Sequence, residues 1–246
     1  MERIKIIVRV RPRTKFERKK GDVRVVEYDS ASQKLVIKNT NVAFPCSSFI
    51  GPSVSQSVVF NDFGIQELVH NAMDGYSATV FAYGMTGSGK TYTVFGDTNT
   101  GLSSKTAVGG DGFLPRSAAY MMTIASTRQD IIKYKFRVTC AEIYNDTVFD
   151  VLSNDRKARH VRESREHGFY VQDMTVVPAA SLTDLLRVIH FASSNRKVDS
   201  HSLNDRSNRS HCLWTVYIDS TPVKIGGAKY GKLTMVDLAG SERSKV

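Results

Sequence analysis

Gly84-Met85-Thr86-Gly87-Ser88-Gly89-Lys90-Thr91 is the stretch of this 246-residue chain that decides its fold. It fits the phosphate-loop pattern GxxxxGK[ST] at every fixed position. The glycines let backbone N–H groups converge on phosphate oxygens, Lys90 supplies a point charge, and the Thr91 hydroxyl can ligate Mg²⁺. Residues 77–83 are nearly all apolar and predict a preceding strand buried on both faces. A helix that starts at Lys90 completes the expected context.

A second segment, residues 235–240 (MVDLAG), predicts an apolar strand that ends in Asp237. An acid at a strand tip beside a phosphate loop is the partner that a nucleotide's Mg²⁺ needs, and Gly240 can offer its N–H to a γ-phosphate. The DxxG pattern also fits an ordinary strand and turn, but the earlier phosphate loop favours the nucleotide role. Residues 204–211 are dense in polar side chains, and taken alone they favour an ordinary loop.

The rest of the chain predicts an α/β domain. Apolar periodicity predicts helices over residues 55–73, 116–127 and 182–192, the last preceded by the capping pair Ser181 and Asp184. Alternation predicts strands over residues 4–10, 23–28, 35–38, 132–143, 213–218 and 233–236. Residues 13–21 and 97–112 read as surface loops. Strands that alternate with helices predict a doubly wound, mainly parallel sheet with helices on both faces.

Composition limits the compartment and the partners. The formal charge of +10 favours an acidic partner through long-range attraction, although a merely soluble basic surface fits equally well. Three cysteines without a CxxC pair suggest neither a zinc site nor disulfides, so we expect buried thiols in a reducing cytosol. The longest apolar stretch, residues 78–85, is far short of the ~20 residues of a membrane helix. These features predict a cytoplasmic protein without membrane insertion.

Several motifs, taken together, resemble a kinesin motor domain. Residues 81–84 (FAYG) run into the phosphate loop, and Lys90-Thr91-Tyr92-Thr93 follows. Residues 204–211 (NDRSNRSH) resemble the family's switch I, NxxSSRSH, and residues 237–242 (DLAGSE) match its switch II. Further matches are residues 9–12 (RVRP), 55–60 (SQSVVF), 112–116 (GFLPR) and 142–145 (EIYN). The motifs lie in the family's order along the whole chain.

The resemblance implies that ATP and Mg²⁺ are the cofactors. Arg9, Pro12 and Tyr92 would form the platform for the adenine, and residues 84–91 would hold the phosphates. This assignment makes the chain an ATPase. The pattern of a phosphate loop with DxxG also serves GTPases, but residues 195–199 (NRKVD) break the guanine motif NKxD.

The two switch motifs carry the implied catalytic roles. Ser207 and Arg209 would close on the γ-phosphate, and Arg209 would pair with Glu242 to shut the site and help position the attacking water. Asp237 would hold Mg²⁺ through water, with Thr91 as a direct ligand. Catalysis of this kind relies on positioning and electrostatics.

Three features depart from the family pattern. Met85 stands where the family usually has Gln, and we expect little effect because the loop uses its backbone there. Asn208 replaces the second serine of switch I, a Mg²⁺ and phosphate ligand in the family, so we expect slower or misregulated hydrolysis. The chain stops at Val246, just past Glu242. We therefore interpret residues 1–246 as one motor domain cut short after switch II, with exposed apolar sheet surface and low stability.

A basic stretch suggests the contact with the track. Arg162, Arg165 and His167, with Arg156, Lys157 and Arg159 before them, fall by resemblance on a loop that faces the microtubule. Tubulin's acidic surface agrees in sign. A solvated charged loop is the alternative, since Glu163 and Glu166 dilute the patch. We assign no nucleic acid partner, and the chain encodes no heptad seam for an oligomer.

The sequence thus predicts a cytoskeletal, microtubule-stimulated ATPase that couples hydrolysis to movement along microtubules. The alternative is a nucleotide-gated or catalytically weak microtubule-binding protein without motility. Asn208 and the missing C-terminal segment keep that alternative open. Comparing ATPase rates with and without microtubules separates the two.

Overall fold

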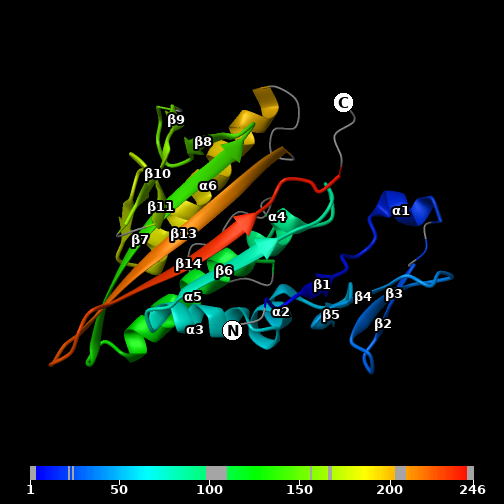
Figure 1. Ribbon diagram of the computed structural model, residues 1–246, viewed down its shortest axis with the longest axis horizontal. Coiled ribbons are helices and arrows are strands. Elements are labelled where there is room, and N and C mark those ends of the chain that lie inside the picture. Colours follow the sequence, from blue (N-terminus) through cyan, green and yellow to red (C-terminus); the bar gives the residue numbers. More distant parts are fainter. Residues whose placement is uncertain are drawn as a thin grey trace.

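The computed structural model describes residues 4–21, 23, 25–97, 110–155, 157–165, 168–202 and 209–242, and for residues 197–202 the backbone alone. A central sheet runs diagonally through the molecule (Figure 1). Its strands lie in the order β6-β14-β13-β7-β8-β9, and β12 pairs with β7. Their bounds are β6 Ser77–Ala82, β7 Ile132–Tyr144, β8 Thr147–Asp150, β9 Ala158–Arg159, β12 Val177–Ala179, β13 Ser210–Pro222 and β14 Lys229–Asp237.

Five helices form one layer against this sheet. They are α2 Gln56–Asp62, α3 Ile65–Met73, α4 Lys90–Val94, α5 Phe113–Thr127 and α6 Leu182–Ser202. Helix α3 contacts β6 and β14, α5 lies between α3 and α6, and α4 contacts both α5 and β14. In Figure 1 the described helices of this layer lie behind the sheet.

The predicted α/β architecture is confirmed, with two differences in detail. The sheet is mixed: β6 and β14 run parallel, whereas the five other strand pairs described are antiparallel. Within the described residues, the helices cover one face of the sheet and not both. The mixed strand direction follows from the connections, because the hairpins β7–β8 and β13–β14 carry no helix and reverse the strand direction.

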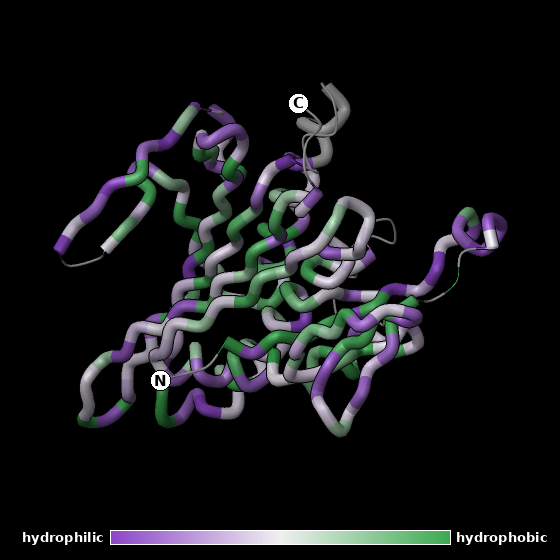
Figure 2. The backbone as a smooth tube through the Cα atoms, turned by 45° about the vertical axis from the view of Figure 1, so that its right-hand side comes forward, coloured by the Kyte–Doolittle hydropathy of each residue, from purple (hydrophilic) through white to green (hydrophobic). Residues whose placement is uncertain are grey.

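Smaller elements lie at the two ends of the molecule. At one end β1 (Ile7–Arg9) pairs with β5 (Ser48–Ile50), next to a sheet of β2 (Val26–Asp29), β3 (Lys34–Ile37) and β4 (Ala43–Pro45). At the other end is the hairpin of β10 (Val161–Ser164) and β11 (Gly168–Val171). Figure 2 shows apolar residues running along the central strands, while the outlying helix α1 is largely hydrophilic.

Some element boundaries differ from the predictions for local reasons. The single helix predicted over residues 55–73 is two helices, because Gly64 has a φ of +90° between them. The loop predicted over residues 13–21 contains α1 (Lys15–Lys19), which a capping box of Thr14 and Glu17 starts. Strand β6 is not buried on both faces: its exposed residues alternate along the strand, because the described helices cover one face of the sheet only.

The core lies between the sheet and the helix layer. Alternate residues of the central strands face the helices and are almost fully buried: Val138, Cys140, Trp214, Val216, Leu233 and Met235. Leu114 and Met121 of α5 fill the helix side of the same cluster. None of the described helices combines the length and apolarity needed to cross a membrane.

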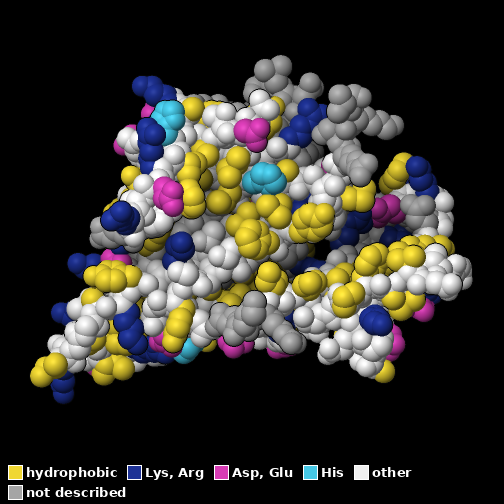
Figure 3. Space-filling model, viewed as in Figure 1, with side chains coloured by type: hydrophobic (Ala, Val, Ile, Leu, Met, Phe, Trp, Pro, Cys, Tyr) yellow, Lys and Arg dark blue, Asp and Glu magenta, His cyan; other side chains and the backbone are white. Residues whose placement is uncertain are grey.

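The side of the sheet away from the helix layer, called the open face, consists of the residues that alternate with the core positions. Register places Thr79, Thr234, Thr215 and Thr139 in one row across four strands of it. The neighbouring row contains Phe81, Val236, Leu213 and Ala141. In Figure 3, which looks onto this face, apolar side chains gather over the central strands.

Candidate nucleotide site

The phosphate loop connects the end of β6 to the start of α4. Gly89 caps α4 in the left-handed region, with a φ of +101°. At Gly84, also at positive φ, a Cβ would lie 2.7 Å from the Ser88 Oγ, so the turn excludes a side chain there. Lys90 donates from Nζ to the Gly84 and Met85 carbonyls at 2.9 and 3.0 Å. These bonds close the loop around the lysine ammonium. The predicted context of strand, loop and helix is therefore present.

The acid predicted to support Mg²⁺ lies beside this loop. Parallel pairing of β14 with β6 sets Asp237 opposite Ala82, at the strand end from which the loop departs. The Thr91 hydroxyl donates to Asp237 Oδ2 at 2.8 Å. Asp237 is 2% exposed, and its Oδ1 is buried without a hydrogen-bond partner in the described chain. A buried free carboxylate oxygen next to a hydroxyl is an oxygen donor set that fits Mg²⁺.

A buried arginine, which the sequence analysis missed, also holds this acid. Arg196 of α6 donates from Nη1 to Asp237 Oδ2 at 3.2 Å, and its guanidinium lies 5.8 Å from the centre of the Phe95 ring. Burial lowers the pKa of Arg196, but the facing Cys212 and Asp237 outweigh this and raise it. The residue sits in a polar stretch of helix with no local signal of burial. Only the packing of α6 reveals its role.

The segment after Asp237 returns to the phosphate loop. The Ser241 N–H donates to the Gly84 carbonyl at 3.0 Å, and the Ala239 N–H donates to His211 Nδ1 at 3.0 Å. The Thr86 N–H donates to the Glu242 carboxylate at 2.9 Å, and the Thr86 hydroxyl donates to its other oxygen. A Cβ on Gly240 would overlap both Thr86 and Glu242. A larger residue at position 240 would therefore have to displace the side chains of Thr86 and Glu242 from their contact.

The structure gives Glu242 a different partner from the predicted one. The sequence predicts a pair with Arg209, whereas the Glu242 carboxylate is bound to Thr86. The Arg209 side chain is exposed, one residue before β13. The bonds from Thr86 lower the pKa of Glu242 to about 2. Pairing with Arg209 would require Glu242 to leave the phosphate loop.

A group of side chains joined by hydrogen bonds forms the other end of the site. Arg9 donates from Nη1 to Gln56 Oε1 at 2.6 Å and to Thr93 Oγ1 at 2.9 Å. Gln56 is 1% exposed, and its amide nitrogen donates to the Tyr92 carbonyl at 2.5 Å. The guanidinium of Arg9 lies 5.6 Å from the centre of the Tyr92 ring. The structure thus brings Arg9 and Tyr92 together, as predicted, and burial lowers the pKa of Arg9.

Arg11 ties this end to the phosphate loop. Its Nε donates to the Gly87 carbonyl at 2.7 Å, and its two Nη atoms form a bidentate pair with Glu17. Glu17 in turn accepts from the Thr14 N–H, so α1 is fastened to the loop through one guanidinium. Pro12 follows Arg11 directly and is exposed. Gln56 and Arg11 lie within the motifs of the resemblance, but no local pattern predicts these contacts.

The remaining predicted residues divide into two groups. Ser207, Asn208 and His167 lie outside the described residues. Arg162 is in β10 and donates to Gln172 at 3.0 Å, and Arg165 is in the turn that follows that strand. The hairpin of β10 and β11 projects from the sheet and exposes Phe169.

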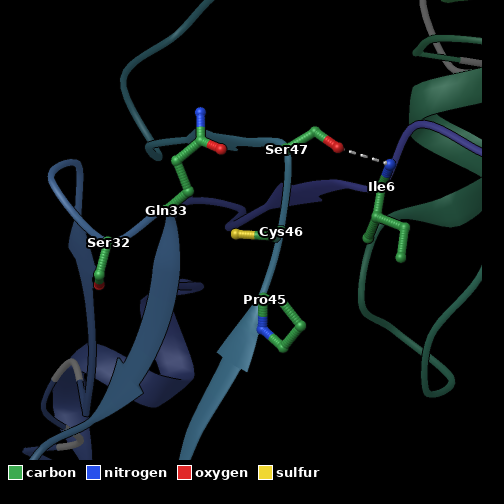
Figure 4. A pocket seen from close by; sticks show the side chains of 6 residues that line it. All are labelled: Ile6, Ser32, Gln33, Pro45, Cys46 and Ser47. Carbon is green, nitrogen blue, oxygen red and sulfur yellow. Dashed lines mark hydrogen bonds between the residues drawn. The ribbon is translucent and has the colours of Figure 1, made fainter. Parts of the chain in front are cut away.

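A separate cavity of about 270 Å³ lies beside the small sheet at the N-terminal end (Figure 4). Its walls are Ile6, Ser32, Gln33, Pro45, Cys46 and Ser47. The Ser47 hydroxyl accepts from the Ile6 N–H at 3.2 Å. The cavity shares no lining residue with the phosphate loop, so it is not part of the candidate site.

A glycine-rich loop between a strand and a helix, with an acid from the adjacent parallel strand, defines the class of phosphate-loop nucleotide-binding domains. The family model for the kinesin motor domain matches residues 9–246. This chain therefore belongs to the kinesin motor domain family. This confirms the resemblance that the sequence motifs indicate, and the fold agrees with it.

Individual comparisons agree with this family. The chain is 35% identical to kinesin-like protein KIN-14P of Arabidopsis thaliana over 252 residues, which cover 98% of this chain and 24% of that protein. It is also 35% identical to KIN-14M of Oryza sativa subsp. japonica, over 89% of this chain and 19% of that protein. The chain thus spans about a quarter or less of these curated relatives.

A solved structure shares the fold. It is titled "Structure of a fast kinesin: Implications for ATPase mechanism and interactions with microtubules". The TM-score is 0.88 at 31% sequence identity, and the match covers 98% of this chain and 67% of that one.

Proposed function

We propose that this chain binds Mg-ATP and hydrolyses it in coupling to microtubule binding and movement. The observation that carries the proposal is the hydrogen bond between Thr91 of the phosphate loop and Asp237 of the neighbouring strand. It places a hydroxyl and a carboxylate, the two protein groups that support nucleotide-bound Mg²⁺, within one cluster. The relative whose title names an ATPase mechanism and interactions with microtubules supports the choice of reaction and partner.

Each wall of the site has a role in this proposal. The backbone N–H groups of residues 84–91 and the Lys90 ammonium hold the phosphates. Thr91 and Asp237 hold Mg²⁺, which when bound would neutralise charge developing on the phosphate oxygens. The adenine base is supported by Arg9, Pro12 and Tyr92. The buried Gln56 holds Arg9 and Tyr92 in place through hydrogen bonds.

The switch residues complete the proposed machinery. Ser207 and Arg209 close on the γ-phosphate, Gly240 donates its N–H to it, and Glu242 helps to position the attacking water. Asn208 stands at a position where the family has a serine ligand. We expect Asn208→Ser to raise the turnover rate, because a shorter hydroxyl replaces an amide oxygen. An unchanged steady-state ATPase rate would refute this expectation.

The proposed partner surface is the hairpin of β10 and β11. Arg162 and Arg165 lie on it, and His167 belongs to the same segment of the sequence. The hairpin projects from the sheet and combines cations with the exposed Phe169, which suits an acidic protein surface. This arrangement supports microtubule binding and, with it, a place on the cytoskeleton in the cytoplasm.

Mg-ATP turnover by residues 1–246, with and without polymerised tubulin, tests the proposal. Microtubule-stimulated turnover is the expected result. Lys90→Ala should abolish nucleotide binding, while Lys38→Ala, which removes a surface lysine paired with Glu27, should leave it unchanged. Nucleotide binding without stimulation would favour the alternative of a microtubule-binding protein without motility. Absence of ATP binding would refute the proposal.

A further inference from the structure

The contact between Glu242 and Thr86 places a carboxylate on the phosphate loop. Backbone N–H groups of such a loop point into the space that phosphate oxygens occupy when a nucleotide binds. The Thr86 N–H is one of these donors, and it is directed at Glu242 Oε2 at 2.9 Å. A carboxylate oxygen is an acceptor with the same charge sign as a phosphate oxygen. The chain's own side chain therefore satisfies a donor that a nucleotide would use.

Neighbouring contacts fix the carboxylate in this place. The Ser241 N–H is bound to the Gly84 carbonyl, one residue before Glu242. The Thr86 hydroxyl makes the second bond to the carboxylate, so both of its oxygens are held by one residue. The charge of Lys90 also stabilises the carboxylate, while its ammonium donates to the loop's own carbonyls. Thr86 and Lys90 of the loop thus both have internal partners.

We propose that Glu242 is an internal competitor for the phosphate loop, which a nucleotide's phosphates must displace before they bind. This inference rests on the proposed function and adds a regulatory step to it. Displacement releases the carboxylate toward the other groups of the site, among which Arg209 is the partner that the sequence predicts. Glu242 then has two alternative positions, one that blocks the phosphate loop and one that closes the site.

The competition has a quantitative consequence. When a binding site is available in only a fraction of the molecules, the apparent dissociation constant rises by the inverse of that fraction. If Glu242 occupies the loop in about nine molecules of ten, the apparent Kd for an anion rises about tenfold. Because the pKa of Glu242 is about 2, below its ordinary 4.5, the carboxylate stays charged above pH 4.5. A change of pH near neutrality therefore does not alter the competition between the Glu242 carboxylate and a nucleotide's phosphates.

Equilibrium binding of inorganic pyrophosphate and of a non-hydrolysable ATP analogue tests the inference without any readout of catalysis. Glu242→Gln should bind both probes more tightly than the unaltered chain, and Glu242→Ala should tighten binding by about tenfold. Glu67→Gln is the charge-matched control, because it also removes one carboxylate, but from an exposed position of α3 that is not part of the nucleotide site. It should change the Kd for pyrophosphate by less than about twofold.

A double-mutant cycle separates the contact from the charge. Thr86→Val keeps the N–H and removes the hydroxyl that binds Glu242. In that background the effect of Glu242→Ala should shrink, because the two residues act through one contact. Equal affinities for Glu242→Ala and the unaltered chain, or weaker binding by the variant, would overturn the inference while the proposed function stands. If no form binds the ATP analogue, the proposed function fails and the inference fails with it.

Discussion

The two faces of the central sheet carry different side chains, although the same strands form both. On the face toward the helices, one row across four strands reads Ala78, Leu233, Val216 and Val138, and all four are buried. The adjacent row, one residue away in each strand and on the open face, reads Thr79, Thr234, Thr215 and Thr139. The change from aliphatic to hydroxyl side chains is complete within a single residue step.

The difference shows how the two faces divide stability and interaction. Burial of the aliphatic row against the helices supplies hydrophobic free energy in proportion to the area removed from water. The threonine row keeps high β-propensity and satisfies its hydroxyls locally, as between Thr215 and Thr234 at 3.2 Å. Next to it, Phe81 of the open face is 63% exposed. We therefore expect substitutions to be costly on the covered face and mild at exposed positions of the open face such as Phe81.

Trp214→Ala should give the largest effect. Trp214 is 1% exposed at the centre of the covered face. Its removal leaves a cavity between the sheet and the helices, at a typical cost of about 3–5 kcal/mol. Urea unfolding followed by circular dichroism measures the loss in free energy of unfolding. A loss below about 1 kcal/mol would mean that the helix layer does not pack on the sheet as described.

Val216→Thr should have an intermediate effect. The substitution keeps shape and β-propensity but puts a hydroxyl among buried apolar neighbours, where it costs about 1–3 kcal/mol without a partner. The same urea titration measures it, with an unchanged denaturant slope showing that the folded state is intact.

Thr215→Val is the matched reverse change on the adjacent residue. It removes the hydrogen bond to Thr234 and adds a methyl group at a position that is 9% exposed, so the two effects offset each other and we expect a change within about 1 kcal/mol. A destabilisation as large as that of Val216→Thr would contradict the assignment of the two faces.

Phe81→Ser should have the smallest effect on stability. A side chain that is mostly exposed contributes little to folding, so the free energy of unfolding should change by less than about 0.5 kcal/mol. Because exposed apolar patches promote association, the variant should self-associate less. Sedimentation velocity at increasing concentration measures this. A clear loss of stability with unchanged association would show that Phe81 is covered in solution.

Local patterns were sufficient for much of the fold and for the centre of the site. The phosphate loop and the strand before it are encoded in contiguous residues whose spacing follows from the chemistry of phosphate, whereas Asp237 reaches the loop through the pairing of β14 with β6. The helix prediction for residues 55–73 missed a single left-handed glycine. Strand direction was not encoded locally, because the same alternating pattern serves parallel and antiparallel strands.

The partners of the site residues depended on long-range packing. Arg196 reaches Asp237 across 41 positions of the chain, and Gln56 reaches Arg9 across 47. Glu242 is 156 positions from Thr86, and the resemblance predicts Arg209 as its partner instead. Ser207 and Asn208, outside the described residues, keep the roles predicted from the resemblance.

By itself, the sequence determined the family, the phosphate loop with its flanking strand and helix, and the alternation of buried and exposed residues in β7. These properties depend on the spacing of residues that are neighbours along the chain. Only the tertiary structure decided that the sheet is mixed, that the described helices share one face, and that Glu242 lies on Thr86. Those properties depend on which distant segments meet, because hydrogen bonds and burial are settled by the whole packed arrangement and not by any one segment.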